Sequence, residues 1–496
     1  MSLPQYFKQL LLSALLLQPV LGLLVNAEEK PNIVFLFADD QRADTIGAWG
    51  NDHISTPNLD RLARSGTSFQ RNYCAGSFSG AVCVASRAML MTGRQWKRLP
   101  PEDPGKDWSG VRLLPEVLKS QAGYRNFIVG KWHNGESNLL RAFQSGESVF
   151  MGGMADHTIV PVQDLVNGKL GPKRTAEKFS SEQFADSAIK FLEEESEEPF
   201  FLYVAFTAPH DPRNPPPADR QKYYDARPPL PENFMPLHPF NNMPQTTSGR
   251  DESLASWPRQ PSEISDQLCE YYGLVSHLDR QVGRILDAVE ASTHSENTIV
   301  IYTADHGLAM GSHGLLGKQN VYEHSMRCPL IIAGPNIPSG KTTQKITYVH
   351  DCFATICRFA GCAVPESVDS VDLSPLWRGV DESVHDFAVL PFQDVQRAIT
   401  DGRWKLHIYP KVNHRLLFDL GADPHELNNL ARQGNANEAR LERALENWRQ
   451  KFGDKDPLVS ESPEPLEPEY DNAKRRKDKW QPAWIREKYF SEDAKE

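Results

Sequence analysis

The sequence predicts an α/β fold: a large mixed, mostly parallel β-sheet between layers of helices, with a smaller antiparallel sheet near the C-terminus. Continuous apolar runs alternate with amphipathic segments over residues 32–303, which is typical of strands buried on both faces between helices. Short strand-like segments then cluster over residues 387–419. With 496 residues, of which 40% are hydrophobic, the chain can form one large and one smaller domain.

The first elements of the predicted sheet follow directly from local signals. The apolar run NIVFLFA over residues 32–38 predicts a buried strand. A helix is expected from Pro57, with Thr56 as its N-cap and Gly66 as its C-cap. A second helix is expected to start near Cys83.

The alternation continues along the chain. Further helices are expected at residues 113–121, 181–194 and 264–290, and further strands at 126–129, 200–206 and 298–303. The Pro-rich residues 209–262 show no periodicity and predict a long irregular excursion. The C-terminal part predicts strands at 387–390, 397–400, 404–409 and 416–419, a hairpin turn at Asp401-Gly402 and a helix at 436–451. The last ~40 residues are charged and Pro-rich and predict an extended or partly disordered tail.

The N-terminal residues 1–27 are predicted to be a cleaved signal peptide. Lys8 precedes an apolar stretch, and Val25-Asn26-Ala27 fits a small-x-small cleavage site. Because Gln18 and Pro19 interrupt the stretch, no stable membrane anchor is expected, with an uncleaved anchor as the alternative. The protein is therefore expected to be exported, to the periplasm, the extracellular space or, in a eukaryote, a lysosomal-type lumen.

Charge and cysteine content exclude some classes of function. The net charge is −11 and no basic stripe is present, so nucleic acid is not an expected partner. None of the seven cysteines forms a CxxC pair, which argues against a zinc ribbon or thioredoxin-type site. An odd number leaves one cysteine over in an exported protein, and Cys83 is our candidate; the other six are either buried thiols or disulfides.

Polar residues gather after the C-terminal ends of several predicted strands: Asp39, Lys131, His133, His210, Asp305 and His306. Ligands of open α/β sheets bind at this edge, so we expect one site there. Asp39, Asp40 and Asp305 would repel one another without a cation. Their oxygen atoms suit calcium or magnesium better than a softer metal. The alternative is that one aspartate of the pair caps a loop or a helix.

The segment Cys83-Val84-Ala85-Ser86-Arg87, followed by Thr92-Gly93-Arg94, resembles the signature of the type I sulfatases of the alkaline phosphatase superfamily. Further segments match in the family's order: Asp39-Asp40, Lys131-Trp132-His133, Pro209-His210, Asp305-His306-Gly307, Gly317-Lys318 and Asp423-Pro424-His425-Glu426. The resemblance implies an alkaline phosphatase-like fold, with a sulfatase catalytic domain at 28–380 and a C-terminal subdomain and charged tail at 381–496. Ala85 departs from the family's proline, which leaves the efficiency of Cys83 conversion open.

The resemblance also implies a nucleophile and a metal site. Cys83 would be converted to formylglycine by a formylglycine-generating enzyme and would then act as a covalent nucleophile. Asp39, Asp40 and Asp305 would hold the calcium ion together with position 83. His306 is expected as a further ligand, or as a residue that only contacts sulfate.

The remaining matches are implied to be catalytic. Arg87 and Lys131 would orient the formylglycine hydrate, and His133 would take a proton from it. His210 and Lys318 would contact the sulfate. His210 is also the expected acid for the leaving alcohol.

The expected function is hydrolysis of a sulfate ester, with a sulfated glycan or a small sulfate ester as substrate. One alternative is a phosphoester or phosphonate hydrolase on the same scaffold. Another is an inactive secreted glycan-binding relative, which Ala85 favours and the full set of site residues opposes. His313 and His324 flank the Lys318 loop and are left open as pocket residues.

Overall fold

The computed structural model describes residues 30–100, 102–242, 249–378, 383–472 and 481–490. The predicted signal peptide at 1–27 and the predicted domain boundary at 380/381 lie outside these ranges. Among the helices of the described ranges, none has the length and apolar character that crossing a bilayer requires.

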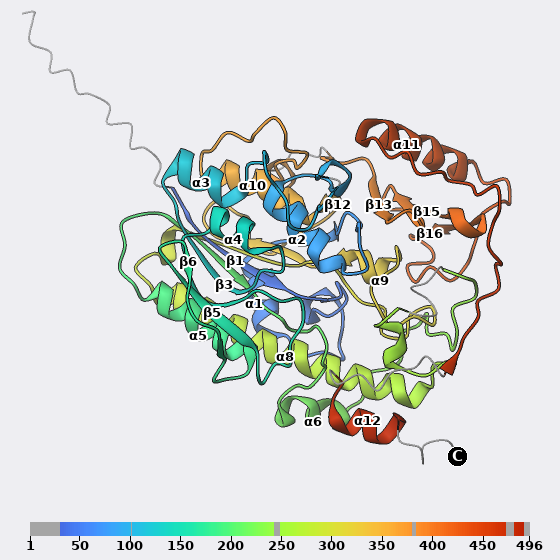
Figure 1. Cartoon of the computed structure of the whole chain (residues 1–496), viewed down its shortest axis with the longest axis horizontal. Helices are drawn as coiled ribbons and strands as arrows, with labels where there is room; N and C mark the ends of the chain where they lie inside the picture. The colour runs from blue at the N-terminus through green and yellow to red at the C-terminus, as the bar shows by residue number, and fades with distance from the viewer. Residues whose placement is uncertain (1–29, 101, 243–248, 379–382, 473–480, 491–496) are drawn as a thin grey trace, which may run out of the picture.

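A 12-stranded sheet forms the centre of the molecule (Figure 1). Its central strands all run parallel, in the order β9 (Thr298–Ala304), β1 (Asn32–Ala38), β8 (Phe200–Ala205), β3 (Arg125–Lys131) and β4 (Ser145–Phe150). The edges add mostly antiparallel pairs, through β2 (Gly66–Tyr73), β5 (Pro161–Val166), β6 (Lys169–Leu170), β7 (Arg174–Thr175), β10 (Arg327–Cys328), β11 (Leu330–Ala333) and β12 (Lys341–Tyr348). The predicted mixed sheet is confirmed.

Helices cover both faces of this sheet (Figure 1). One layer consists of α2 (Val82–Thr92), α3 (Leu114–Ala122), α4 (Glu136–Ala142) and α10 (Cys352–Phe359). The other consists of α1 (Pro57–Ser65), α5 (Ser180–Leu192) and α8 (Pro261–Ala291), with α6 (Pro217–Asp225) packed against α8.

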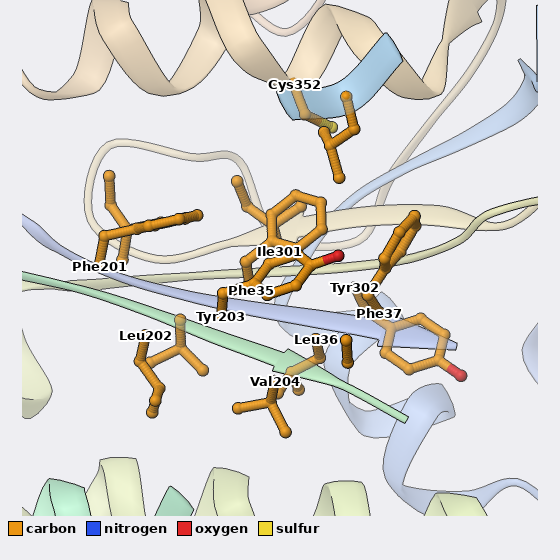
Figure 2. Close-up of a cluster of buried hydrophobic side chains, with 14 of the residues drawn as sticks. Phe35, Leu36, Phe37, Phe201, Leu202, Tyr203, Val204, Ile301, Tyr302 and Cys352 are labelled. Carbon is orange, nitrogen blue, oxygen red and sulfur yellow. The ribbon is translucent and has the colours of Figure 1, made fainter. Parts of the chain in front are cut away.

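The central strands are apolar along their whole length because both of their faces are buried. Phe35 of β1 stacks on Tyr203 of β8, with ring centroids 5.8 Å apart, on one face. Leu36 and Val204, the next residues in the same register, fill the opposite face (Figure 2). All of these side chains are almost fully buried, which explains why the sequence shows continuous apolar runs there.

A separate antiparallel sheet lies near the C-terminus, as predicted. Its strands are β13 (Ala388–Phe392), β14 (Gln396–Thr400), β15 (Trp404–Tyr409) and β16 (His414–Asp419). The turn between β14 and β15 contains Gly402 at φ 89°, a conformation that glycine adopts without strain. Helix α11 (Ala436–Phe452) packs on this sheet through Leu441 and Leu445.

Helix α1 begins at Pro57 and ends at Ser65, so Thr56 and Gly66 flank it as predicted, but neither residue caps it in the expected way. The Thr56 hydroxyl donates to Asp60 at 3.1 Å and accepts the Gly47 N–H at 2.8 Å, so it makes no bond that caps the helix. Gly66 has an extended φ of −136° and starts β2, so it is no left-handed cap.

Two segments contain more structure than the sequence predicted. The excursion at 209–262 includes α6, whose Asp219 accepts a hydrogen bond from Arg280 of α8 at 2.8 Å. The charged tail includes helix α12 (Ala483–Phe490), whose Lys488 donates to Asp266 of α8 at 2.6 Å. Both helices contact α8, and periodicity within the segments does not report such contacts.

Candidate active site

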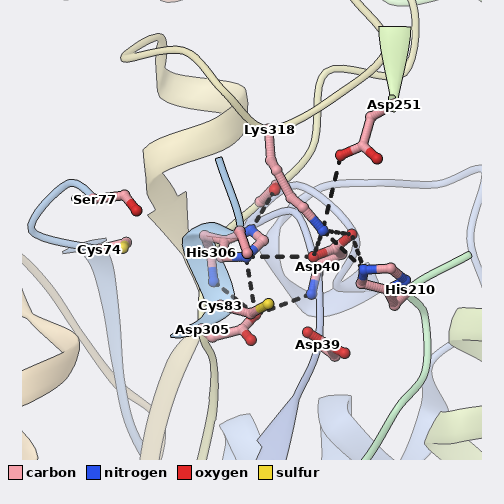
Figure 3. A network of polar contacts seen from close by, with 12 residues as sticks. Asp39, Asp40, Cys74, Ser77, Cys83, His210, Asp251, Asp305, His306 and Lys318 are labelled. Atoms are coloured by element: carbon pink, nitrogen blue, oxygen red, sulfur yellow. Dashed lines mark hydrogen bonds and ion pairs between the residues drawn. The ribbon is translucent and has the colours of Figure 1, made fainter. Parts of the chain in front are cut away.

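The candidate site lies at the C-terminal edge of the parallel strands (Figure 3). Asp39 follows β1 and Asp305 follows β9, and the two strands pair up to Ala38 and Ala304. The Asp305 N–H donates to the Ala38 carbonyl at 3.2 Å, which keeps both carboxylates side by side. Cys83 joins them from the first turn of α2. Strand pairing therefore brings together residues far apart in the sequence.

Four predicted metal ligands form one cluster. Ligand atoms of Asp39, Cys83, Asp305 and His306 all lie within 4.8 Å of one another, and all four residues are buried. Nδ1 of His306 donates to the Gly307 carbonyl at 2.9 Å. In the neutral ring, Nε2 then carries a lone pair.

The carboxylates of Asp39 and Asp305, with Asp40 beside them, give this cluster oxygen donors that fit a hard divalent cation. His306 Nε2 lies 3.3 Å from Asp40 Oδ1 and 3.7 Å from Asp305 Oδ1. Asp39 Oδ1 and His306 Nε2 are also buried without a hydrogen-bond partner. Buried acceptors that face one another are costly, and a cation bound by mainly carboxylate oxygens would remove that cost.

Asp40 occupies a different position from its neighbour Asp39. Its two carboxylate oxygens accept hydrogen bonds from Lys318 Nζ at 3.0 and 2.9 Å. Asp40 therefore lies between the four-residue cluster and Lys318. It meets the cluster at His306 and through its N–H, which donates to Asp305 Oδ1 at 3.0 Å.

Two buried cations balance the charge of the cluster. Arg87 donates to Asp305 Oδ2 and to the Lys131 carbonyl, both at 3.1 Å. Lys131 donates to Asp39 Oδ2 at 2.5 Å. Burial alone would lower the pKa of Arg87, but Asp305 and the other anionic groups outweigh it and raise that pKa above its ordinary value. Buried charges persist when they are paired in this way.

His133 lies beside Cys83, with Nδ1 3.3 Å from Sγ. Burial, followed by the positive charges of Lys131 and Arg87, lowers the pKa of His133 to about 2. The imidazole is therefore neutral at ordinary pH.

His210 and Lys318 form a second contact pair next to Asp40 (Figure 3). Nδ1 of His210 donates to the Asp211 carbonyl at 2.8 Å, so Nε2 accepts from Lys318 Nζ at 2.9 Å. Burial and then Lys318 lower the pKa of His210 well below its ordinary value. Asp40 and Asp251 raise the pKa of Lys318 well above its usual range, although burial opposes them.

Sequence reasoning missed Asp251 and Gln319. Asp251 is buried, and one of its oxygens lies 4.0 Å from Lys318 Nζ. Gln319 Nε2 donates to Asp251 and to the Gly80 carbonyl, both at 2.9 Å, and so links the Lys318 loop to the segment before Cys83. Asp251 comes from the aperiodic excursion, where no motif marks it.

His313 and His324 lie outside the metal cluster. Nδ1 of His313 lies 3.2 Å from Nε2 of His324, and Nε2 of His313 donates to the Glu426 carbonyl at 3.0 Å. His313 thus connects the Lys318 loop to the C-terminal region, and His324 contacts His313.

The chain is similar to known proteins over most of its length. The family model described as "Sulfatase" matches residues 31–362, and the model described as "N-sulphoglucosamine sulphohydrolase, C-terminal" matches residues 311–451. An arylsulfatase of Clostridium perfringens is 28% identical over 446 residues, covering 81% of this chain and 90% of that protein. An N-acetylglucosamine-6-O-sulfatase of Bacteroides thetaiotaomicron is 27% identical over 511 residues, covering 88% and 89%.

The fold also matches solved structures. One, in complex with its substrate D-glucosamine-2-N,6-O-disulfate, superposes with a TM-score of 0.71 at 24% identity. The match covers 87% of this chain and 100% of that one.

Proposed function

Because this chain belongs to the type I sulfatase family of the alkaline phosphatase superfamily and is a sulfuric ester hydrolase, we propose that it removes sulfate from a sulfated carbohydrate. We propose further that it uses formylglycine at position 83 beside a bound divalent cation. One observation carries this mechanism: Cys83 Sγ lies within 4.8 Å of ligand atoms of Asp39, Asp305 and His306.

Position 83 suits a nucleophile that attacks an anion. Formylglycine would supply a hydroxyl nucleophile through hydration of its aldehyde, which is covalent catalysis. The residue lies in the first turn of α2, where free backbone N–H groups and the helix dipole favour negative charge. Conversion would require a formylglycine-generating enzyme before the chain folds, because Cys83 is 2% exposed in the fold.

The cation is proposed to be calcium, with magnesium as the second choice. Asp39, Asp40, Asp305 and His306 would hold it with position 83, and their mainly oxygen donors support a hard cation. Bound there, the cation would stabilise negative charge on the sulfate and on the attacking oxygen.

The protein's side chains would transfer the protons and stabilise the remaining charge. His133 is neutral and contacts position 83, so it would take the proton from the second hydroxyl there. Arg87 and Lys131 would keep the carboxylates and the nucleophile in place. Lys318 and His210, which lie in contact at 2.9 Å, would contact the sulfate. His210, when protonated at Nε2, would be the acid for the leaving oxygen.

A sulfated sugar is the proposed substrate class. The similar Bacteroides protein is named for a sulfated N-acetylglucosamine, and the similar solved structure holds a sulfated glucosamine. The predicted signal peptide supports export to a compartment outside the cytoplasm, where the protein could meet sulfated glycans. The excursion at 209–262 contributes Asp251 beside Lys318, so we expect this segment to select the sugar.

The test combines mass spectrometry with parallel assays. The peptide containing residue 83 should carry an aldehyde in place of the thiol in active protein. That protein should hydrolyse an aryl sulfate much faster than the matching aryl phosphate, and Cys83→Ala should abolish both activities. A preference for phosphate, or full activity with an unmodified thiol, would reject the proposal. A panel of sulfated mono- and oligosaccharides would then identify the substrate.

A further inference from the structure

Lys318 is carried by a long connection between β9 and β10, residues 305–326, which is irregular up to the short helix α9 (Glu323–Met326). This loop folds back on itself: the Leu308 N–H donates to the His324 carbonyl, and the Ala309 N–H donates to the Gly317 carbonyl, both at 2.9 Å. A segment with so little regular structure needs partners elsewhere to fix its conformation.

Glu426 of the C-terminal region supplies such partners on both sides of Lys318. Its carbonyl accepts from Nε2 of His313 at 3.0 Å. Its carboxylate oxygen Oε2 accepts the Glu323 N–H at 2.7 Å. His313 and Glu323 are equally distant from Lys318 in the sequence, so one residue of the C-terminal region clamps the loop before and after the lysine.

The contacts of Glu426 are buried and charged. The other carboxylate oxygen, Oε1, accepts from Lys405 Nζ at 3.0 Å and from His407 Nε2 at 3.1 Å. Lys405 is fully buried and also bonds Glu323 at 2.9 Å. A buried ion pair of this kind is costly to disrupt and specifies one arrangement more than it adds stability.

The backbone is strained at both residues of the contact between Glu426 and His313. Glu426 has φ 56° and His313 has φ 53°, in the left-handed region that such residues rarely adopt. Strain of this kind persists only where the surroundings over-determine the conformation, and it gathers at functional sites.

We propose that Glu426 is a positioning residue: it holds the loop so that the Lys318 ammonium lies against Asp40 and His210. This inference rests on the proposed role of Lys318 in sulfate-ester hydrolysis. The C-terminal segment Asp423-Pro424-His425-Glu426 then has a specific task, which is to complete a site formed otherwise by the large sheet.

The test is a double-mutant cycle on the full-length, converted protein. Glu426→Gln keeps the shape of the side chain, and Lys405 keeps its bond to Glu323, so the variant should fold. We expect kcat/KM for an aryl sulfate to fall by about 10- to 100-fold, as for other small displacements of catalytic groups. In a Lys318→Ala background the same substitution should cost less than about threefold, because it acts through Lys318.

A matched control and a second variant complete the design. Glu442→Gln removes a more exposed ion pair with Arg415 on the same C-terminal unit and should leave kcat/KM unchanged. If Glu426→Gln does not fold, His313→Asn is the second variant. It removes the hydrogen bond from His313 to the Glu426 carbonyl, and asparagine tolerates the positive φ at this position. It should show the same dependence on Lys318.

The same cycle can be measured by calorimetric binding of inorganic sulfate, which needs no turnover. Independent, multiplicative losses in either measurement would overturn the positioning role, as would wild-type kcat/KM in the folded Glu426→Gln variant. Absence of sulfate-ester hydrolysis in the converted wild type would instead reject the proposed function.

Discussion

Lys318 Nζ lies 2.9 Å from Nε2 of His210. Because Nδ1 of His210 already donates to the Asp211 carbonyl, Nε2 is the nitrogen free to exchange a proton. The lysine therefore faces the one ring nitrogen through which His210 could donate a proton to a leaving group.

Replacement of His210 by alanine should affect alkyl sulfates most. An alkoxide leaving group needs a proton, so turnover should fall by roughly 10²–10⁴-fold. Turnover of a nitrophenyl sulfate, whose leaving group needs little protonation, should fall far less. Steady-state kinetics on both substrates measure the difference, and equal losses would remove His210 from the acid role.

Gly153→Ala should displace His133. A Cβ built at Gly153 would overlap the imidazole of His133, so the ring must shift relative to position 83. We expect kcat to fall by about 100-fold, the typical effect of a displacement of this size. Gly171→Ala is the control, since its Cβ would lie an ordinary 3.4 Å from the Asp164 carbonyl. Unchanged kcat in folded Gly153→Ala would show that the position of His133 does not matter.

Removal of divalent cations should lower both activity and stability. Chelation should lower the melting temperature, and added calcium should restore it. At a hundredfold excess of calcium over Kd, binding should add roughly 2.7 kcal/mol to the free energy of unfolding. His306→Ala should weaken calcium binding at least ~10-fold in calorimetry. The exposed His53 gives the control His53→Ala. Indifference of the wild type to chelator and to calcium would contradict the metal site.

The His385–Asp351 contact should make stability depend on pH. Nε2 of His385 lies 2.8 Å from Asp351, and this carboxylate outweighs burial and raises the pKa of His385. Because the pKa of His385 is higher in the folded state, the contact contributes its full stabilisation below the unfolded-state pKa of ~6.5. That contribution disappears as the pH rises through the folded-state pKa.

The His385→Gln variant checks this dependence. It should lose about 1.5–3 kcal/mol of unfolding free energy at acidic pH, the value of a hydrogen bond to a charged group. It should lose little at alkaline pH. Urea unfolding of both proteins on each side of neutrality provides the comparison, and a pH-independent difference would refute the charged contact.

Much of the fold could be predicted because the central strands carry their own signal. β1, β8 and β9 are buried on both faces, so each is an uninterrupted apolar run. The ends of β1, β9 and β3 also locate Asp39, Asp305 and Lys131, and the loop after β8 locates His210. The Cys83 segment was recognisable because its residue types and spacing are local.

Other features depended on contacts between distant residues. Asp39 and Asp40 are adjacent in the sequence and looked equivalent, yet Asp40 has φ 66° and bonds Lys318, while Asp39 bonds Lys131. No pattern in the sequence distinguishes them. Asp251 was missed for a similar reason, since its partners Lys318 and Gln319 come from another segment.

The amino-acid sequence thus specified which strands and helices form and which reactive side chains stand at their ends, because periodicity and local motifs act over short stretches. The tertiary structure alone decided which carboxylate faces which cation, and that a C-terminal glutamate holds the Lys318 loop. Those relations depend on packing and charge pairing across hundreds of residues, which no local pattern encodes.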